Sequence, residues 1–504
     1  MLNTTDEEQI NALGISLDTV YNQIEQFKKG FPPMTLERAA IPQDGIIVLN
    51  KKEEENFISF YSDHSTNYNI VKFVPASGAA SRMFKSVFSF MENNLGKSNQ
   101  DVALMKEKKM ETFFSGLTEF AFYDDLKEVM IRQGLQLEPL IEDGKYAEVL
   151  EFLLTEKGLN YGNLPKGLLK FHKEEGRAKM PVEEHLLEGA EYAKDSEGKV
   201  NLHFTVSPEH EPEFKKKLAE LLPEYEQKLG VRFVITYSQQ LKSTDTIAVD
   251  ESNQPFRNPD GSLLFRPAGH GALLRNLNSL ESDIVFLQNI DNVVPDKLKP
   301  KTTSSKKVLG GVLLSVKEKV QELFDKINRG EVENSELRDF LAKELNTEMP
   351  SGATREEMIA KLDRPLRVCG MVLNTGEAGG GPFWCKNQDN SVSLQIVESS
   401  QFDTTNESQM KIVKSSTHFN PVDVVVFKKD LQGQKYNSLK HVDEQSAFIS
   451  SKSKDGKALK AMELPGLWNG SMSDWNTIFV EVPAITFNPV KEVNDLLRDE
   501  HRSS

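Results

Sequence analysis

The sequence predicts an α/β fold with a mixed, mostly parallel central sheet that is flanked by helices and interrupted by helical insertions. Strand-like and helical runs alternate from LHFTVS (202–207) through EPEFKKKLAELLPEYEQKLG to VRFVITYS (231–238). Strand-like segments return at 283–291, 366–400 and 419–428. Strands that alternate with helices are typical of βαβ units, in which helices cover the faces of a parallel sheet. Two long helical stretches break this alternation and are therefore interpreted as insertions.

The length of 504 residues predicts more than one packed lobe, because single cores rarely grow beyond about 250–300 residues. We expect an N-terminal helical segment over residues 1–67 and an α/β core over residues 68–430. The helical insertions are expected within the core at about 101–160 and 315–350. Residues 431–504 are expected to pack on the core and to end as a strand that runs into a closing helix.

Composition and charge argue against several classes of protein. The chain is 38% hydrophobic and 27% charged, with a formal net charge of −15 at pH 7, which argues against nucleic acid as a partner. No run approaches the roughly 18 apolar residues that a membrane helix needs, and the polar, acidic start MLNTTDEEQINALG lacks a signal segment. We therefore expect neither a membrane nor a nucleic-acid partner, and the oligomeric state is left open.

Cysteine content indicates the redox compartment. Cys369 and Cys385 are the two cysteines of the sequence, so no disulfide framework is predicted and a cytoplasmic location is expected. The two could pair with each other, but two reduced thiols packed near each other are the favoured interpretation.

A turn of small residues, FVPASGAASRMFK (73–85), follows the first strand-like run of the core. Small side chains let backbone N–H groups approach an anion, and the start of the following helix adds its positive dipole end. The candidate nucleotide-binding residues of this turn are Ala76, Ser77, Gly78 and Ser81. Arg82 and Lys85 would add formal positive charge. A tight strand-to-helix turn is the alternative, and both the Walker pattern and GxGxxG are absent.

A second segment, FRPAGHGALLRNLNSLESDIVFLQNIDNVVPD (265–296), combines a glycine turn with a strand that ends in a carboxylate. Gly269, His270 and Gly271 open a helix, where His270 is either a ligand-binding group or an exposed turn residue. Asp291 follows the strand at the kind of position where α/β proteins place ligands and metals, and one of its oxygens can ligate Mg²⁺. An Asx turn formed by Asp291 is the alternative.

Two further segments have an unusual composition, VLNTGEAGGGPFWCKN (372–387) and PGLWNGSMSDWNT (465–477). Glycine loses much entropy on ordering, so the loop with Gly376 and Glu377 is interpreted as passing over a bound sugar, with a flexible hairpin tip as the alternative. Trp468 and Asn469 are interpreted as residues that bind a sugar or a base, although most tryptophans fill cores.

These motifs carry a resemblance to a known family. ASGAASRM resembles the opening signature of the sugar-nucleotide pyrophosphorylases, which are sugar-1-phosphate nucleotidyltransferases with a glycine-rich turn that closes in Thr-Arg-Met. The Pro165-Lys166 pair resembles the Pro-Lys of that family, whose lysine grips phosphate. RPAGHGALLRNL is similar to the turn that reads the base in UDP-sugar pyrophosphorylases, and FLQNIDN is similar to their strand with the metal aspartate. LQIVESSQ and STHFNPVDVV resemble their sugar-binding segments, which implies such roles for Glu398 and Asn420.

A closer resemblance comes from the combination of NTGEAGGGPFW, THFNPVD and PGLWNGSMSDWNTIFVEVP. It resembles an uncharacterised bacterial family known as a domain of unknown function and described as nucleotidyltransferase-like. The chain departs from the pyrophosphorylase pattern in several places, which include Ser77 in place of a glycine and Ser81 in place of threonine. Ala80 replaces the second glycine of the turn, and a helical insertion separates Lys166 from that turn. Lys85 is therefore the alternative for the role of Lys166.

The resemblance implies a nucleotide-diphospho-sugar transferase-like fold and a reaction that joins a sugar-1-phosphate to a nucleoside triphosphate, with UTP as the candidate, and releases pyrophosphate. Arg82 would clamp the β- and γ-phosphates, Lys166 would bridge the two substrates, and Asp291 would hold Mg²⁺. A glycosyltransferase that uses a nucleotide-sugar donor and a non-catalytic nucleotide-sugar-binding protein are the alternatives. The sequence leaves catalytic activity, base and sugar open.

Overall fold

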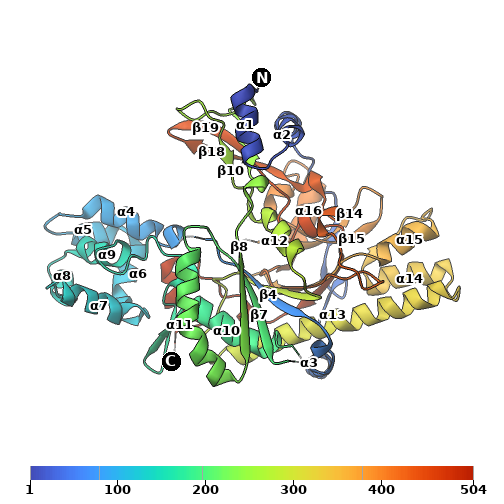
Figure 1. Cartoon of the computed structure of the whole chain (residues 1–504), viewed down its shortest axis with the longest axis horizontal. Helices are drawn as coiled ribbons and strands as arrows, with labels where there is room; N and C mark the ends of the chain where they lie inside the picture. Colours follow the sequence, from blue (N-terminus) through green and yellow to red (C-terminus); the bar gives the residue numbers. More distant parts are fainter. Residues whose placement is uncertain (1, 79, 196, 377–378, 503–504) are drawn as a thin grey trace. The chain divides into compact units, whose positions relative to one another are not determined.

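The fold is mixed α/β, with mostly parallel sheet strands flanked by helices, which confirms the predicted fold class (Figure 1). A computed structural model describes residues 2–78, 80–195, 197–376 and 379–502. The chain groups into two compact units. Unit 1 comprises Met1–Ile70, Gln240–Leu287 and Lys306–Ala484, and unit 2 comprises Val71–Gln239, Gln288–Ser305 and Ile485–Ser504. Each unit therefore consists of chain segments that are far apart in the sequence.

The main sheet strands of unit 1 run in the order β2-β3-β20-β13-β17-β11. The pairs β2–β3, β3–β20 and β20–β13 are parallel, whereas β17 pairs antiparallel with β13 and β11. Their bounds are Ile41–Pro42 (β2), Gly45–Ile47 (β3), Asn476–Glu481 (β20), Leu366–Leu373 (β13), Val424–Phe427 (β17) and Ile284–Leu287 (β11). β13, β17 and β11 are buried along almost their whole length, as is typical of strands with both faces covered.

Unit 1 also contains a second, antiparallel sheet in the order β1-β14-β15-β12, and two small two-stranded antiparallel sheets, β9–β10 and β18–β19. Their bounds are Leu36–Ala39 (β1), Gly381–Lys386 (β14), Val392–Val397 (β15), Thr347–Glu348 (β12), Thr246–Ile247 (β9), Phe265–Arg266 (β10), Phe448–Lys454 (β18) and Lys457–Glu463 (β19). The short β16 (His418–Phe419) pairs with the end of β13.

The helices of unit 1 include the long α13, which is yellow in Figure 1 and begins in unit 2. Their bounds are Thr4–Ala12 (α1), Leu17–Lys29 (α2), Lys51–His64 (α3), Leu274–Ser279 (α12), Lys299–Asn328 (α13), Asn334–Glu344 (α14), Arg355–Leu362 (α15) and Glu407–Ser415 (α16). Within the unit, Tyr61 of α3 packs edge-on against Phe286 of β11, with ring centroids 5.9 Å apart. Aromatic contacts of this kind attach the helical layer to the sheet.

The strands of unit 2 run β4-β7-β8 and are parallel throughout. β4 (Ile70–Pro75), β7 (Lys199–Thr205) and β8 (Arg232–Ser238) are accompanied by α10 (Pro181–Tyr192), which packs on β7, and by α11 (Glu211–Leu229), which packs on β8. β7, α11 and β8 confirm the βαβ alternation predicted from the sequence. A small hairpin joins β5 (His172–Glu174) to β6 (Arg177–Lys179).

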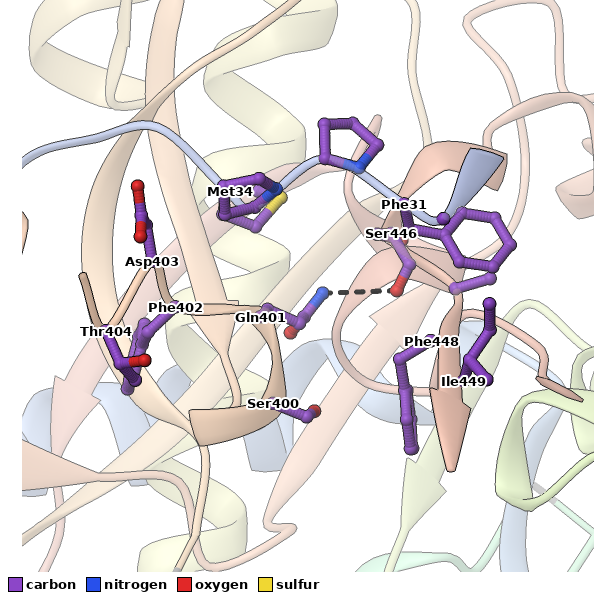
Figure 2. A pocket seen from close by; sticks show the side chains of 14 residues that line it. Phe31, Met34, Ser400, Gln401, Phe402, Asp403, Thr404, Ser446, Phe448 and Ile449 are labelled. Atoms are coloured by element: carbon purple, nitrogen blue, oxygen red, sulfur yellow. Dashed lines mark hydrogen bonds between the residues drawn. The ribbon is translucent and has the colours of Figure 1, made fainter. Parts of the chain in front are cut away.

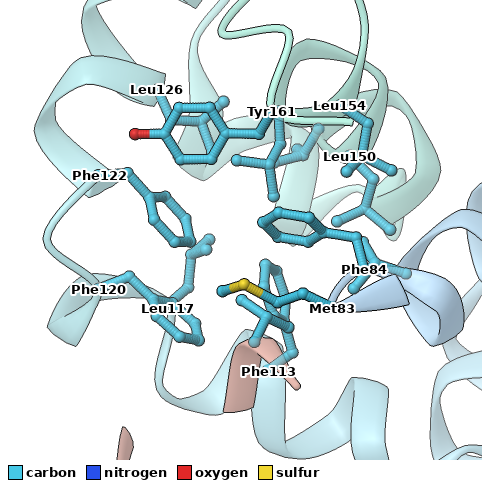
Figure 3. Packing of buried hydrophobic residues seen from close by; sticks show 14 of the residues in the cluster. Met83, Phe84, Phe113, Leu117, Phe120, Phe122, Leu126, Leu150, Leu154 and Tyr161 are labelled. Carbon is cyan, nitrogen blue, oxygen red and sulfur yellow. The ribbon is translucent and has the colours of Figure 1, made fainter. Parts of the chain in front are cut away.

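The predicted helical insertion near 101–160 is a group of short helices in unit 2, coloured blue to teal in Figure 1. The helices in this span are α5 (Asp101–Lys106), α6 (Lys108–Ser115), α7 (Tyr123–Arg132), α8 (Leu137–Glu142) and α9 (Tyr146–Leu154), and α4 (Lys85–Asn94), which precedes the span, packs against α9. Their core contains many aromatic residues, and Phe84 and Met83 lie among Phe113, Phe122 and Tyr161 (Figure 3). The insertion is thus packed around the two residues that directly follow Arg82.

The C-terminal end departs from the prediction of a closing helix. The strand is present as β20, but the chain after it forms short 3₁₀ turns, of which the last is η12 (Val493–Leu497). Residues 1–67 contain β1, β2 and β3 in addition to the expected helices. The proposed domain boundaries themselves stay a prediction.

Two expectations from composition can be compared with the structure. Both Cys369 and Cys385 are free and buried, and burial raises the pKa of the Cys369 thiol to about 11. In the described part of the chain, no helix has the length and apolar character that crossing a bilayer requires. The cytoplasmic location stays a prediction.

Acid is expected to destabilise unit 2 through His203 of β7. This side chain is 4% exposed, contacts the hydroxyls of Thr236 and Ser238, and stacks on the Phe73 ring. Burial lowers the pKa of His203 from 6.5 to about 4. The unfolded chain therefore binds an extra proton between these two pH values, so stability is complete above pH 6.5 and falls as the pH drops towards 4, by roughly 3 kcal/mol for this group.

Thermal unfolding at several pH values between 7 and 4 checks this expectation. His203→Gln, which keeps hydrogen-bonding groups but does not titrate, should have a smaller loss of Tm on acidification than the wild type. His64→Gln is the matched control, because the side chain of His64 is 37% exposed and lies in α3 of unit 1. Equal acid slopes for the wild type and His203→Gln would contradict the assignment.

Candidate functional site

The small-residue turn after β4 is joined through its backbone to the segment that contains Lys166. Ala80 N donates to Leu164 O at 3.2 Å, and Lys166 N donates to Gly78 O at 3.3 Å. Ala76 N donates to Thr205 O of β7 at 2.8 Å. Side chains larger than a methyl group would hold these backbone segments apart. Close packing is therefore one reason why the turn consists of small residues.

Part of the turn nevertheless remains accessible to a ligand. Ser77 and Ser81 are exposed, and a Cβ built on Gly78 meets no atom within 4 Å. Ala76 and Ala80 are buried, and their N–H groups already donate to other backbone carbonyls. Of the predicted nucleotide-binding residues in this turn, Ser77, Gly78 and Ser81 are therefore open to an anion, whereas Ala76 has a packing role.

The positive charges that follow the turn point outward. Met83 and Phe84 are buried in the helical core of unit 2 (Figure 3), while Arg82 and Lys85 are exposed. Among the described residues, neither Arg82 nor Lys85 has an ion-pair partner. Because Met83 and Phe84 are anchored in the core, Arg82 and Lys85 on either side of them lie at the surface beside the turn.

Lys166 and Asp291, which are predicted from separate motifs, are in direct contact in unit 2. The Nζ atom of Lys166 lies 2.8 Å from Asp291 Oδ2 and also donates to the carbonyl oxygen of Val490 at 2.8 Å. The two side chains are 14% and 18% exposed, respectively, so the pair is largely shielded from solvent and still open on one side. The long helical insertion therefore does not separate Lys166 from the NIDN turn that contains Asp291.

Local sequence explains how Lys166 reaches this position. Pro165 precedes the 3₁₀ turn η4 (Lys166–Leu168), and Gly167 lies directly against Ile290. A Cβ on Gly167 would lie 3.0 Å from Ile290 Cγ1, so a larger residue would push the segment away from the strand end. Ile290 N in turn donates to Pro75 O at 3.3 Å, which places the NIDN turn next to the small-residue turn.

The predicted GHG turn lies in unit 1, where it packs against the PGLWN segment. A Cβ on Gly271 would lie 2.1 Å from Pro465 O, and Gly269 has a φ of +76°, so both positions require glycine. The His270 ring stacks on Trp468 with centroids 4.0 Å apart and an interplanar angle of 9°. Two motifs that the sequence presents far apart therefore form one structural feature.

Hydrogen bonds fix the orientation of His270. Leu467 N donates to His270 Nδ1 at 2.9 Å, so the proton of the neutral ring is on Nε2. Nε2 lies 3.7 Å from Glu398 Oε1, and both side chains are partly exposed. This arrangement offers a donor and an acceptor side by side, which suits a hydroxyl group of a ligand.

The remaining predicted sugar-binding residues also lie in unit 1. Asn420 is buried, with its Nδ2 donating to Gly370 O and its Oδ1 accepting from Val422 N, so its amide is used by the backbone. Asn469 is buried, and its Nδ2 donates to Gln401 Oε1 at 3.3 Å. Gly376 is exposed with a φ of +119°. The prediction for Glu377 falls outside the described residues.

A pocket of about 400 Å³ in unit 1 is lined in part by Gln401 (Figure 2), which is hydrogen-bonded to Asn469. Gln401 lies on its wall, where its Nε2 donates to Ser446 O and its Oε1 accepts from Asn469 and from Glu398 N. The apolar part of the wall includes Phe31 and Met34 (Figure 2). The pocket thus has a mixed apolar and polar lining next to two predicted sugar-binding residues.

Sequence reasoning missed the roles of several residues that hold this arrangement. Arg367 is fully buried, and its Nη1 donates to Trp468 O at 2.6 Å, which fixes the loop that carries the Trp468 ring. Gln401 lies at the end of the motif LQIVESSQ but has no signal of its own. Val490 contacts Lys166 through its backbone carbonyl, and no pattern of side chains in the sequence predicts such a contact.

Comparison with known proteins identifies the family. A family model described as a domain of unknown function (DUF4301) matches residues 3–502. The chain belongs to this family. None of the curated proteins matches the DUF4301 chain in sequence.

Solved structures similar to this DUF4301 protein are sugar-nucleotide pyrophosphorylases. The uridine diphosphate N-acetylglucosamine pyrophosphorylase from Trypanosoma brucei is 11% identical, with a TM-score of 0.47 over 95% of this chain and 74% of that chain. A mutant UDP-glucose pyrophosphorylase from Leishmania major, in complex with UDP-glucose, is 12% identical, with a TM-score of 0.47 over 100% and 80%. A putative UDP-N-acetylglucosamine pyrophosphorylase from Entamoeba histolytica is 10% identical, with a TM-score of 0.43 over 90% and 82%.

Proposed function

We propose that this protein is a nucleotidyltransferase that joins a sugar-1-phosphate to a nucleoside triphosphate and releases pyrophosphate. The observation that carries the proposal is the contact between Lys166 and Asp291, at 2.8 Å, beside the small-residue turn. A lysine and a carboxylate at the end of a sheet strand, next to an accessible turn, are the groups that phosphoryl transfer requires. The motifs that resemble the pyrophosphorylases lead to the same two residues.

In this proposal the cations of unit 2 bind and align phosphates. Arg82, whose guanidinium is exposed beside the turn, would bind the terminal phosphates of the triphosphate through its planar fork of donors. Lys166 would hold the attacking and the attacked phosphate oxygens together and stabilise negative charge on them. No covalent nucleophile is needed, because the sugar phosphate itself attacks. Lys85, exposed near Arg82, is the alternative for the role of Lys166.

The residues present fit a bound Mg²⁺ ion. Asp291 Oδ2 accepts from Lys166, and in the described part of the chain Oδ1 accepts no hydrogen bond. The described residues contain no group of three His, Cys, Asp or Glu side chains arranged for a metal. Mg²⁺ commonly takes one or two carboxylates and fills its other positions with phosphates and water, so a single carboxylate suffices. The ion would neutralise charge on the reacting phosphates.

His270, Trp468 and Glu398, which lie together in unit 1, would recognise uncharged groups of a ligand. The donor on His270 Nε2 and the acceptor on Glu398 would bind a hydroxyl group, and Trp468 offers an aromatic ring for stacking. The GHG turn supports a role in binding the base, with UTP as the candidate triphosphate. Asn469 and Gly376 remain proposed sugar-binding residues, and Asn420 would support this region through the backbone.

Pyrophosphate release tests the function. We expect the purified protein, mixed with Mg²⁺ and a panel of triphosphates and sugar-1-phosphates, to release pyrophosphate with at least one pair and to stop when EDTA is added. Asp291→Asn should lose this activity while remaining folded, because Asp291 is partly exposed. Hydrolysis of nucleotide sugars without any dependence on pyrophosphate would instead indicate a glycosyltransferase. Binding of nucleotide sugars with no turnover across the panel would indicate a non-catalytic protein.

A further inference from the structure

The C-terminal segment of unit 2 is bound to the strand end that carries Asp291. Val490 N donates to Asp291 O at 3.1 Å, and Val493 N donates to Met83 O at 3.2 Å. Residues 490–493 therefore connect the end of the NIDN motif with the residue that follows Arg82. A segment that the sequence presents as a terminal extension lies in the candidate site.

Asn292 attaches this segment through both ends of its side-chain amide. Its Oδ1 accepts from Asn488 N at 2.8 Å, and its Nδ2 donates to Thr486 O at 3.1 Å. The side chain is 4% exposed, and Gln288 Nε2 donates to the Asn292 carbonyl at 2.7 Å. Because a buried amide with both ends bonded has one preferred orientation, Asn292 determines where residues 486–490 run.

The consequence of this attachment is seen at Lys166. Its ammonium group has two acceptors in the structure, Asp291 Oδ2 and the Val490 carbonyl, both at 2.8 Å. An ammonium on a flexible stem needs several acceptors to take up one direction. The Val490 carbonyl, placed by Asn292, supplies the acceptor that Asp291 alone does not.

We propose that Asn292 is a positioning residue: it holds the C-terminal segment so that the Val490 carbonyl orients the Lys166 ammonium. The role of Lys166 in catalysis rests on the proposed function, but its orientation can be measured without any turnover. Other contacts keep the segment attached when Asn292 is changed. Val493 and Leu496 belong to the buried core of the helical insertion, and His501 Nδ1 lies 2.9 Å from His172 Nε2.

The reactivity of Lys166 tests the proposal. The folded full-length protein is treated briefly with acetic anhydride, and the acetylation of Lys166 is measured by mass spectrometry relative to that of Lys170. In Asn292→Ala the ratio should rise about tenfold, because Lys166 loses a hydrogen bond that is worth more than a neutral one. Lys170 is a suitable internal standard because it forms a surface ion pair with Asp125 in the same unit.

Asn94→Ala is the matched control. Asn94 is also 4% exposed in unit 2, and its amide also makes two side-chain hydrogen bonds, to Phe90 O and from Lys97 Nζ. Both variants should lose thermal stability, but the labelling ratio should rise in Asn292→Ala alone. Equal ratios in the two variants would overturn the proposal and leave Asn292 a structural residue.

A conservative variant keeps the test decisive if Asn292→Ala does not fold. Asn292→Asp retains the acceptor for Asn488 N–H and loses the donor to Thr486, so its labelling ratio should lie between those of the wild type and Asn292→Ala; an unchanged ratio overturns the proposal. Where the wild type releases pyrophosphate, Asn292→Ala should lower kcat with little change in KM. An inactive wild type would refute the proposed function, and the labelling result would still decide the role of Asn292.

Discussion

Replacing Lys166 with alanine is expected to lower kcat for nucleotide-sugar formation by about 10²–10³-fold, because removal of one positioned charge at a reacting phosphate has an effect of this size. The ammonium group contacts Asp291 and Val490 in the structure, so its charge is held at one place. KM should change less than kcat, since the interaction strengthens as charge develops in the transition state. Initial rates of pyrophosphate release over a range of substrate concentrations check both values.

Lys170→Ala is the control for this variant. Lys170 lies in the same short segment, and its ion pair with Asp125 is partly exposed, so its replacement should leave the rate close to that of the wild type. The fold of Lys166→Ala should persist, because Asp291 is 18% exposed and can be solvated when its partner is lost. A rate near that of the wild type would transfer the role to Lys85, and Lys85→Ala should then show the loss.

The elements that position the candidate site could be predicted from local sequence patterns. The alternation of β7, α11 and β8 follows from hydrophobic periodicity, which acts over a few residues and is visible in a single sequence. Lys166 and Asp291 could be singled out as residues because each lies in a short motif. The resemblance implies that they share one site with Arg82, but nothing in the spacing of the motifs determines that Lys166 and Asp291 are in direct contact.

Contacts made by the backbone could not be predicted. The Val490 carbonyl holds Lys166, but every residue has a carbonyl group, so the sequence gives no reason to choose this one. The same is true of the small-residue turn, where Ala76 and Ala80 donate N–H groups to Thr205 and Leu164. Small residues predict that another backbone segment packs closely against the turn. Only the structure shows which segment that is.

Buried charge was also missed, because a charged residue in a sequence is usually interpreted as a surface group. Lys72 is fully buried on β4, and its Nζ lies 2.8 Å from Glu188 Oε2 of α10, which is 2% exposed. The run IVKFVP is recognisably a strand, but the lysine within it has no visible partner until α10 is placed against the sheet. Amphipathic patterns locate elements, and they do not identify pairs between elements.

Breaking this buried ion pair is expected to have the largest effect on stability. Glu188→Gln should lower the free energy of unfolding of unit 2 by about 3–5 kcal/mol, because the fully buried Lys72 ammonium loses its 2.8 Å contact with the Glu188 carboxylate. Lys72 also donates to His185 O at 3.4 Å and lies 5.3 Å from the Tyr192 ring, but neither neighbour carries a full negative charge. Thermal unfolding should show a Tm lower by roughly 10 °C.

Two comparisons separate the loss of the pair from a general effect of mutation. Glu128→Gln removes an exposed ion pair with Arg132 on α7 and should change stability by less than about 0.5 kcal/mol. The double variant Lys72→Met with Glu188→Leu should recover most of the stability lost in Glu188→Gln, because no uncompensated charge remains buried. If the double variant were instead as unstable as the single one, shape at the interface between β4 and α10 would be the dominant factor rather than charge. Since desolvation opposes the attraction between the two ions, the pair is expected to fix the position of α10 on β4 more than it stabilises unit 2.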